Sequence, residues 1–205
     1  MPRFVIVGQE ASSSPHFSLL DLPSTSGRLD VLLRCLRASL LVSHGLRRDV
    51  VTYLVLLGDP ATPRTVRVEG AAIRFLRPDE RSLAMLVQRA LALPSVHGES
   101  GNAFTELRAG IAVADGGLDT VLGDVGRATL YVLEQGATDL RDLAPVTEEC
   151  VFFVGDHLGF DAPTRARLVE LGATPIGVGP VSVHADDAIA IVCNELDRRA
   201  VPRER

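Results

Sequence analysis

The chain has 205 residues, of which 46% are hydrophobic, a formal net charge of −5 and a mean hydropathy of +0.21. This composition predicts a folded protein with a sizeable core, excludes a disordered chain, and argues against a surface that is basic all over. No apolar run is long enough to span a membrane, and the N-terminus MPRFVIVGQE has no small-residue cleavage site. We therefore expect no signal peptide and a cytoplasmic protein.

The cysteines and basic residues limit which metal and anion sites the chain can form. Cys35, Cys150 and Cys193 are far apart and form no CxxC pair, which fits free thiols in a reducing compartment and argues against a structural zinc site. All 21 basic residues are arginine, a bias typical of a GC-rich coding sequence. Any anion site must therefore use guanidinium or backbone N–H groups.

The first half of the chain predicts a helix between buried strands. In order, we expect a strand over 3–8, a Ser- and Pro-rich loop over 11–27, a leucine-striped helix from Arg28, an interior strand over 50–58, a hairpin or two edge strands over 65–76, and a helix over 82–93. Residues 94–102 are the clearest linker or long loop.

The second half alternates strands and helices more regularly. We expect strands over 110–114, 128–136, 150–155 and 173–179, helices over 118–126 and 162–172, and a closing helix capped by Ser182. Several strands are apolar on both faces, which is typical of a mostly parallel sheet covered by helices on both sides. The sequence predicts one α/β domain over 1–205. The apolar stripe of the closing helix is either core or a dimer surface.

Three strand ends in this second half have a common character. One strand ends at Leu133-Glu134, the next at Gly155, and the last runs through Gly177 and Gly179 to Pro180. In open α/β sheets, ligands bind beyond the carboxyl ends of the strands, and glycine lets the backbone approach a ligand closely. The pattern predicts a ligand site there, although each glycine alone is equally typical of a turn.

Asp156 and His157 directly follow the second of these strands, which ends at Gly155. They could ligate a metal, but no third ligand is spaced nearby, so we expect no metal site. No GxSxG motif is present, which argues against a serine hydrolase. Between Gly27 and Arg48, five arginines accompany the single acid Asp30. This cationic segment is either a solvated helix face or a phosphate-binding surface.

Five motifs in order carry a resemblance to a known family. GRLDVLLRC, SHGLRRDVV, RPDERS, VFFVGDHLGF and VHADDAIAIVCNELD are together similar to the archaeal-type tRNA pseudouridine-54 N1-methyltransferases (TrmY) of the SPOUT class, over about residues 4–197. The resemblance implies an α/β fold with a C-terminal trefoil knot, a rare exception to the rule against knots. It also implies S-adenosylmethionine (SAM) as cofactor and a homodimer that acts on tRNA.

The resemblance also implies where the cofactor binds. Carried over by motif, the SAM pocket includes Leu133, Gly155, Val178, Gly179, Pro180, Val181, Ser182 and Val183. Gly155 would then give the cofactor room against the backbone, while Asp156 and His157 brace the turn. The chain departs from the family where Ala188 stands in place of an expected cysteine. Cys193 lies five residues on and faces elsewhere on the helix.

Chemistry suggests the catalytic candidates. The methyl of a sulfonium is already activated, so the enzyme must align it with N1 of pseudouridine and remove the N1 proton. Asp79 and Asp30 each have an arginine neighbour and are candidate bases, although either carboxylate could instead serve as a cap or a structural ion pair. Arg28 is the third catalytic candidate. Arg47, Arg48 and Arg81 would hold phosphates or orient the base.

Two alternatives remain open at this point. The substrate could be a free pseudouridine-like nucleoside, which would need no basic surface. The chain could also be a non-catalytic, knotted RNA-binding protein, although nothing in the expected cofactor pocket looks degraded.

Overall fold

The structure is a computed structural model that describes residues 1–58, 62–94, 104–143 and 149–200. Its strands are β1 (Pro2–Ser12), β2 (Leu41–Val42), β3 (Gly45–Leu46), β4 (Val51–Gly58), β5 (Arg64–Glu69), β6 (Thr105–Arg108), β7 (Ile111–Asp115), β8 (Thr129–Leu133), β9 (Cys150–Gly155) and β10 (Thr174–Ile176). Its helices are α1 (Leu22–Thr25), α2 (Leu29–Leu40), α3 (Glu80–Leu91), α4 (Leu118–Val125), α5 (Ala162–Glu170) and α6 (Ala185–Ala200), with a 3₁₀ turn η1 (Leu140–Asp142).

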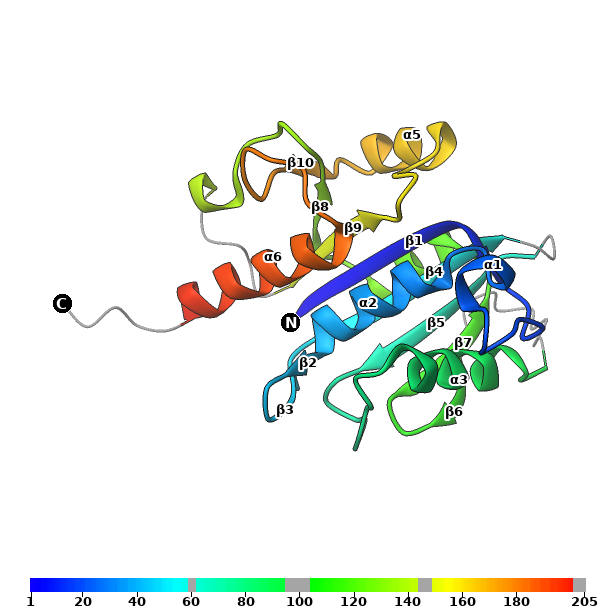
Figure 1. Cartoon of the computed structure of the whole chain (residues 1–205). Coiled ribbons are helices and arrows are strands. Elements are labelled where there is room, and N and C mark those ends of the chain that lie inside the picture. The colour runs from blue at the N-terminus through cyan, green and yellow to red at the C-terminus, as the bar shows by residue number, and fades with distance from the viewer. Residues whose placement is uncertain (59–61, 95–103, 144–148, 201–205) are drawn as a thin grey trace.

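Eight strands form one sheet in the order β10-β8-β9-β1-β4-β5-β7-β6 (Figure 1). The first five of these are parallel to one another, and β5, β7 and β6 continue the sheet as antiparallel neighbours. The expected α/β fold with a mostly parallel sheet is confirmed. The described helices are too short or too polar to cross a membrane.

Strand periodicity divides the core into two layers. On one face, Phe4, Ile6 and Phe152 pack against the apolar sides of α2, α3 and α6. On the other face, Val5 and Phe153 pack against α4 and α5. Because successive strand residues point to opposite faces, a strand that is apolar at every position needs a helical layer on each side. The three cysteines are free thiols, as predicted, and all three are buried.

Two boundaries differ from the sequence prediction. The segment 65–76 is neither a hairpin nor an edge: β5 lies between β4 and β7, and the chain leaves the sheet after Glu69. The Gly70 N–H donates to the Val50 carbonyl, and Arg48 donates to the carbonyls of Gly70 and Ile73. These bonds occupy the groups that a second strand would need for pairing.

The closing helix also begins later than predicted. Its first intrahelical bond runs from the Ala188 N–H to the His184 carbonyl, so Ser182 is not the N-cap. Ser182 belongs instead to the connection between β10 and α6. The predicted linker over 94–102 falls almost entirely outside the described residues, and the single-domain assignment stays a prediction.

Candidate functional site

A cavity of about 370 Å³ lies at the carboxyl ends of β8, β9 and β10. That volume is within the range of small-molecule sites in proteins. Seven of the eight predicted cofactor residues line it: Leu133, Gly155, Val178, Gly179, Val181, Ser182 and Val183. Pro180 does not line this cavity and instead borders a neighbouring hollow beside Ile191 of α6. The structure thus gathers three strand ends that are spread over more than 40 residues of the chain.

Sequence reasoning did not assign several other lining residues to a site. They are Glu134, Gln135, Val154, Asp156, Gly159, Phe160, Arg165, Ile176, Ala185 and Ala188. Arg165 on α5 forms an ion pair with Glu134, which joins that helix to the end of β8. For Glu134, a polar residue directly after a buried strand, the sequence did contain a signal for a ligand site. No sequence pattern indicated Phe160 or Arg165, because it is the tertiary fold that places α5 beside this edge of the sheet.

Gly155 is required by the turn that follows it. A Cβ at this position would come within 2.7 Å of the Gly159 Cα and carbonyl carbon. Real Cβ atoms do not approach backbone that closely, so the 156–159 turn can fold back over β9 only because residue 155 has no side chain. We predicted that Gly155 leaves room for the cofactor, but this contact shows that it leaves room for the Gly159 backbone.

Asp156 holds the same turn against β1. Its carboxylate accepts a hydrogen bond from the Gln9 N–H at 2.8 Å and another from the Leu158 N–H at 2.8 Å. Its own N–H donates to the Val7 carbonyl at 3.1 Å. The His157 Nδ1 lies 3.9 Å from the Asp156 carboxylate. Asp156 therefore braces the turn, as the sequence predicted, and forms part of the cavity wall.

Replacement of Asp156 by alanine should loosen this wall. Two part-buried N–H groups would lose their acceptor, at a total cost of about 1–3 kcal/mol in the free energy of unfolding. We expect a lower melting temperature and faster amide exchange at Gln9 and Leu158. His157→Ala is the matched control and should change stability by less than about 0.5 kcal/mol. Equal effects of the two substitutions would contradict the assignment.

Arg28 and Asp30 form a rigid pair at the start of α2. The Arg28 Nε and Nη2 donate to the two Asp30 carboxylate oxygens at 3.0 and 3.1 Å. Among the described residues other than glycine, only Arg28 has a positive φ, at 62°. A left-handed conformation is unfavourable for a residue with a side chain, so the surrounding contacts must hold the Arg28 backbone in place.

Gly27 makes this backbone path possible. Its φ is 59°, and a Cβ would lie 1.7 Å from the Glu10 carbonyl oxygen at the end of β1. Only glycine allows that approach. The GRLD motif thus lies against the end of β1, near Asp156. The pKa of Arg28 is raised mainly by the hydrogen bond and the charge of Asp30, and the charge of Asp156 contributes as well. Arg28 and Asp30 consequently lie near the cavity wall.

Asp30 is unsuited to be a proton acceptor. Its side chain is 4% exposed, and Arg34 Nη1 donates to the Oδ2 atom at 3.1 Å, in addition to the two bonds from Arg28. Burial raises the pKa of Asp30, but the hydrogen bonds and charges of Arg28 and Arg34 outweigh it, and the net pKa lies below its ordinary value. A carboxylate held ionised in this way positions Arg28.

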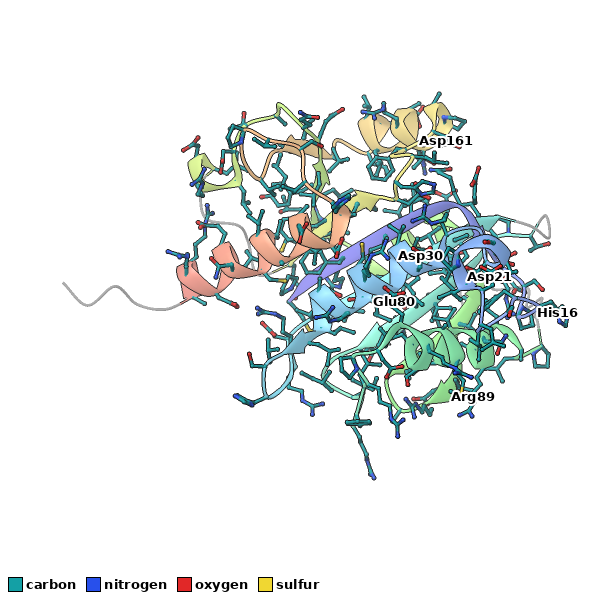
Figure 2. The ribbon with its side chains drawn as sticks, in the orientation of Figure 1. His16, Asp21, Asp30, Glu80, Arg89 and Asp161 are labelled. Atoms are coloured by element: carbon teal, nitrogen blue, oxygen red, sulfur yellow. The ribbon has the colours of Figure 1, made fainter. Side chains whose placement is uncertain are left out.

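Asp79 lies in a different part of the molecule. It is the N-cap of α3, where its Oδ1 accepts from the Ser82 N–H at 2.8 Å, and this bond lowers its pKa. The next residue, Glu80, accepts from the same Arg34 that contacts Asp30, so α3 connects to the Arg28–Asp30 pair (Figure 2). Asp79 itself does not line the cavity.

The predicted RNA-binding arginines occupy varied environments. Arg47 forms two hydrogen bonds of 2.7 Å with Asp197 on α6. Arg48 donates to two carbonyls of the loop after β5. Arg81 is exposed in the first turn of α3. Since Arg28 and Arg34 contact Asp30, most guanidinium groups of the cationic segment 27–48 have partners within the chain, and their role in RNA binding stays a prediction.

Ala188 faces the cavity, whereas Cys193 does not. Ala188 is buried in the cavity wall one turn into α6. Cys193 is buried beside Arg47, and burial raises the pKa of its thiol to about 11. It therefore remains a protonated thiol and does not substitute for a cysteine at position 188, as the helix geometry predicted.

Known proteins resemble this chain along its whole length. Residues 1–201 match the family described as "Putative SAM-dependent RNA methyltransferase". The chain is 39% identical over 203 residues to the tRNA (pseudouridine(54)-N(1))-methyltransferase of Methanosarcina acetivorans, covering 99% of this chain and 94% of that protein. It is 38% identical over 197 residues to the protein of the same name from Halobacterium salinarum, covering 96% of each.

A solved structure has the same fold. The crystal structure of Archaeoglobus fulgidus Nep1 bound to S-adenosylhomocysteine matches with a TM-score of 0.63 at 17% identity, covering 98% of this chain and 99% of that one. At this identity the likeness concerns the fold.

Proposed function

The chain belongs to the family of SAM-dependent RNA methyltransferases that its full-length match identifies, and we propose that it transfers a methyl group from SAM to N1 of pseudouridine 54 in tRNA. One observation supports the proposal most directly: the carboxyl-end cavity, whose wall includes Asp156, lies near Arg28, a half-exposed guanidinium held by the buried Asp30. A cofactor site and a fixed cation next to it are what alignment of a methyl donor with a nucleobase requires.

The cavity residues fit SAM by their chemistry. Apolar side chains of Leu133, Val154 and Ile176 form walls suited to the adenine ring, and the main chain of the β10–α6 connection offers donors and acceptors. Glu134 and Ser182 are placed to bind hydroxyl or ammonium groups. When bound, SAM supplies a methyl group already activated on a sulfonium sulfur.

Arg28 and Asp30 would act on the acceptor base. The Arg28 side chain is 40% exposed although Asp30 fixes it, so it can hold a carbonyl of the base while the base is oriented. A guanidinium at that position also stabilises negative charge that develops on the base as the N1 proton leaves. Asp30 is then a positioning residue.

The proton acceptor and the oligomeric state are linked in this proposal. Asp79 is exposed and lies outside the cavity lining, so it can act as base only in an assembly that brings it to a cavity. Val181, Val183 and Ile191 are exposed apolar side chains at the cavity rim and on the adjoining side of α6. The exposed apolar side chains support a homodimer. Sedimentation velocity at micromolar concentration tests it, and a monomer would contradict it.

Further features stay predictions. The trefoil knot would lie where the 134–143 segment meets the chain after β10, since the Gly177 N–H donates to Thr138 and the Leu140 N–H donates to Gly177. The cytoplasmic location rests on the substrate class.

The decisive assay offers labelled SAM to pseudouridine-containing tRNA stem-loops and to free pseudouridine. We expect label in the stem-loop and none when uridine replaces pseudouridine. In uridine, N1 is bonded to the ribose and carries no hydrogen, so it cannot accept a methyl group. Label in the free nucleoside alone would favour a small-molecule enzyme. RNA binding without methyl transfer would favour a non-catalytic protein.

A further inference from the structure

Two basic hollows flank the loop of residues 70–79, which connects β5 to α3. One, of about 440 Å³, includes Arg77, Arg89 and Arg108 in its lining. The other, of about 780 Å³, has Arg37, His44, Arg48 and Arg74. Phe75 and Leu76 line both hollows. We call the two together the loop-70 surface.

The loop holds Phe75 outward on a fixed backbone. Phe75 is 64% exposed, whereas Ile73 and Leu76 on either side are 1% and 4% exposed and anchor the loop in the core. Arg48 fixes the start of the loop by donating to the carbonyls of Gly70 and Ile73. A large aromatic side chain presented to solvent by a braced loop is the arrangement of a stacking platform.

The charges of the loop-70 surface have one sign. No Asp or Glu is among the described residues that line either hollow, although the protein carries a net charge of −5. The guanidinium groups of Arg37, Arg74, Arg89 and Arg108 make no ion pair or hydrogen bond within the described part of the chain. Figure 2 shows Arg89 at the outer side of α3. Free guanidinium groups beside an aromatic ring match the phosphates and bases of RNA.

Within one subunit, this surface is far from the carboxyl-end cavity. Glu69 pairs with Val51 at the amino end of β4, whereas Gly155 lies level with Val7 of β1 and so with the other end of β4. At about 3.3 Å per residue, the run from Val51 to Val55 covers about 13 Å, and three strand spacings of about 4.8 Å separate β5 from β9. A single nucleoside cannot contact both places.

We propose that the loop-70 surface binds a single-stranded part of the RNA substrate away from the nucleotide that is methylated, an inference that rests on the proposed function. One base stacks on Phe75. Phosphates on either side of it contact guanidinium groups, with Arg74 on one side and Arg89 on the other. The surface would explain how an acidic protein selects an RNA over a free nucleoside.

Phe75→Ala tests the stacking contact. Loss of one base–aromatic stack should weaken binding of full-length tRNA about 5- to 150-fold in a filter-binding titration. Phe75→Trp should retain wild-type affinity, and Val169→Ala, at another exposed apolar side chain, is the matched control. SAM affinity and the turnover number at saturating tRNA should not change, because the platform lies outside the cavity.

The Arg74→Ala/Arg89→Ala double variant tests the phosphate contacts. Removal of two single-strand phosphate contacts should reduce the slope of log K against log salt by about 1.4. Arg127→Ala, an exposed arginine outside both hollows, should leave the slope unchanged. Unaltered tRNA affinity in Phe75→Ala together with an unaltered slope in the double variant would overturn the proposal.

Failure of the proposed function gives a different result. If wild-type protein bound tRNA but methylated no RNA, the function would be wrong, and the binding titrations would still decide the loop-70 surface. If methylation of tRNA proceeded normally and with an unchanged KM in both Phe75→Ala and the arginine double variant, the function would stand and the surface would be wrong.

Discussion

Replacing Gly155 with alanine is expected to weaken SAM binding by at least about 100-fold, equivalent to about 2.7 kcal/mol. The added Cβ would lie 2.7 Å from the Gly159 backbone, which cannot move without displacing the 156–159 turn. That turn carries Asp156 and part of the cavity wall. Isothermal titration calorimetry with SAM measures the loss.

Gly45→Ala is the matched control for this substitution. A Cβ at Gly45 meets nothing within 4 Å, and its φ is not in the left-handed region. It lies in the small β2–β3 hairpin, outside the carboxyl-end cavity. We expect its SAM affinity to equal that of the wild type. An unchanged affinity in Gly155→Ala, with the protein folded by circular dichroism, would contradict the role given to the turn.

Substitution of Arg28 by alanine is expected to lower the turnover number for methyl transfer by about 10²–10³-fold, the size typical of losing one preorganised charge that faces a transition state. SAM affinity should be unchanged, because Arg28 does not line the cavity. Arg28→Lys should recover little, since an ammonium cannot reproduce the two-point bond to Asp30. Arg127→Ala controls for loss of one positive charge.

Asp30→Asn separates positioning from base catalysis. If Asp30 only holds Arg28, the turnover number should fall less than in Arg28→Ala, and the pH profile should keep its acidic limb. A general base would give the opposite result, namely a loss at least as large as that of Arg28→Ala together with disappearance of that limb. Stability should also fall, because Arg28 and Arg34 would then face a neutral amide in a nearly buried position.

Asp30 also makes stability depend on pH in a predictable direction. Its folded-state pKa lies below the ordinary value, so it stabilises the fold above the unfolded-state pKa near 4. This contribution is lost as the pH falls through the folded-state pKa. The Asp30→Asn variant should therefore lose less stability than the wild type between pH 6 and pH 3 in urea titrations.

Local sequence pattern determined the fold class and the place of the carboxyl-end cavity at the strand ends. Strands β1 and β9 are apolar at successive positions, and that pattern requires helices on both faces. The strand ends at Leu133 and Gly155 line the cavity with the Val178–Val183 segment, Pro180 apart, because parallel strands bring their carboxyl ends to one edge. Hydrophobic periodicity depends on residues that are close in the chain, so it can be recognised in the sequence alone.

Tertiary structure alone decided which charged groups are free to act. Arg47 is paired with Asp197, which is 150 residues away, whereas Arg37, on the outer side of α2, is exposed. Asp30 and Asp79 look equivalent in the sequence, each beside an arginine, yet one is buried under two guanidinium groups and the other caps a helix at the surface. Ion pairing depends on distances between segments remote in the chain, which composition and spacing do not contain.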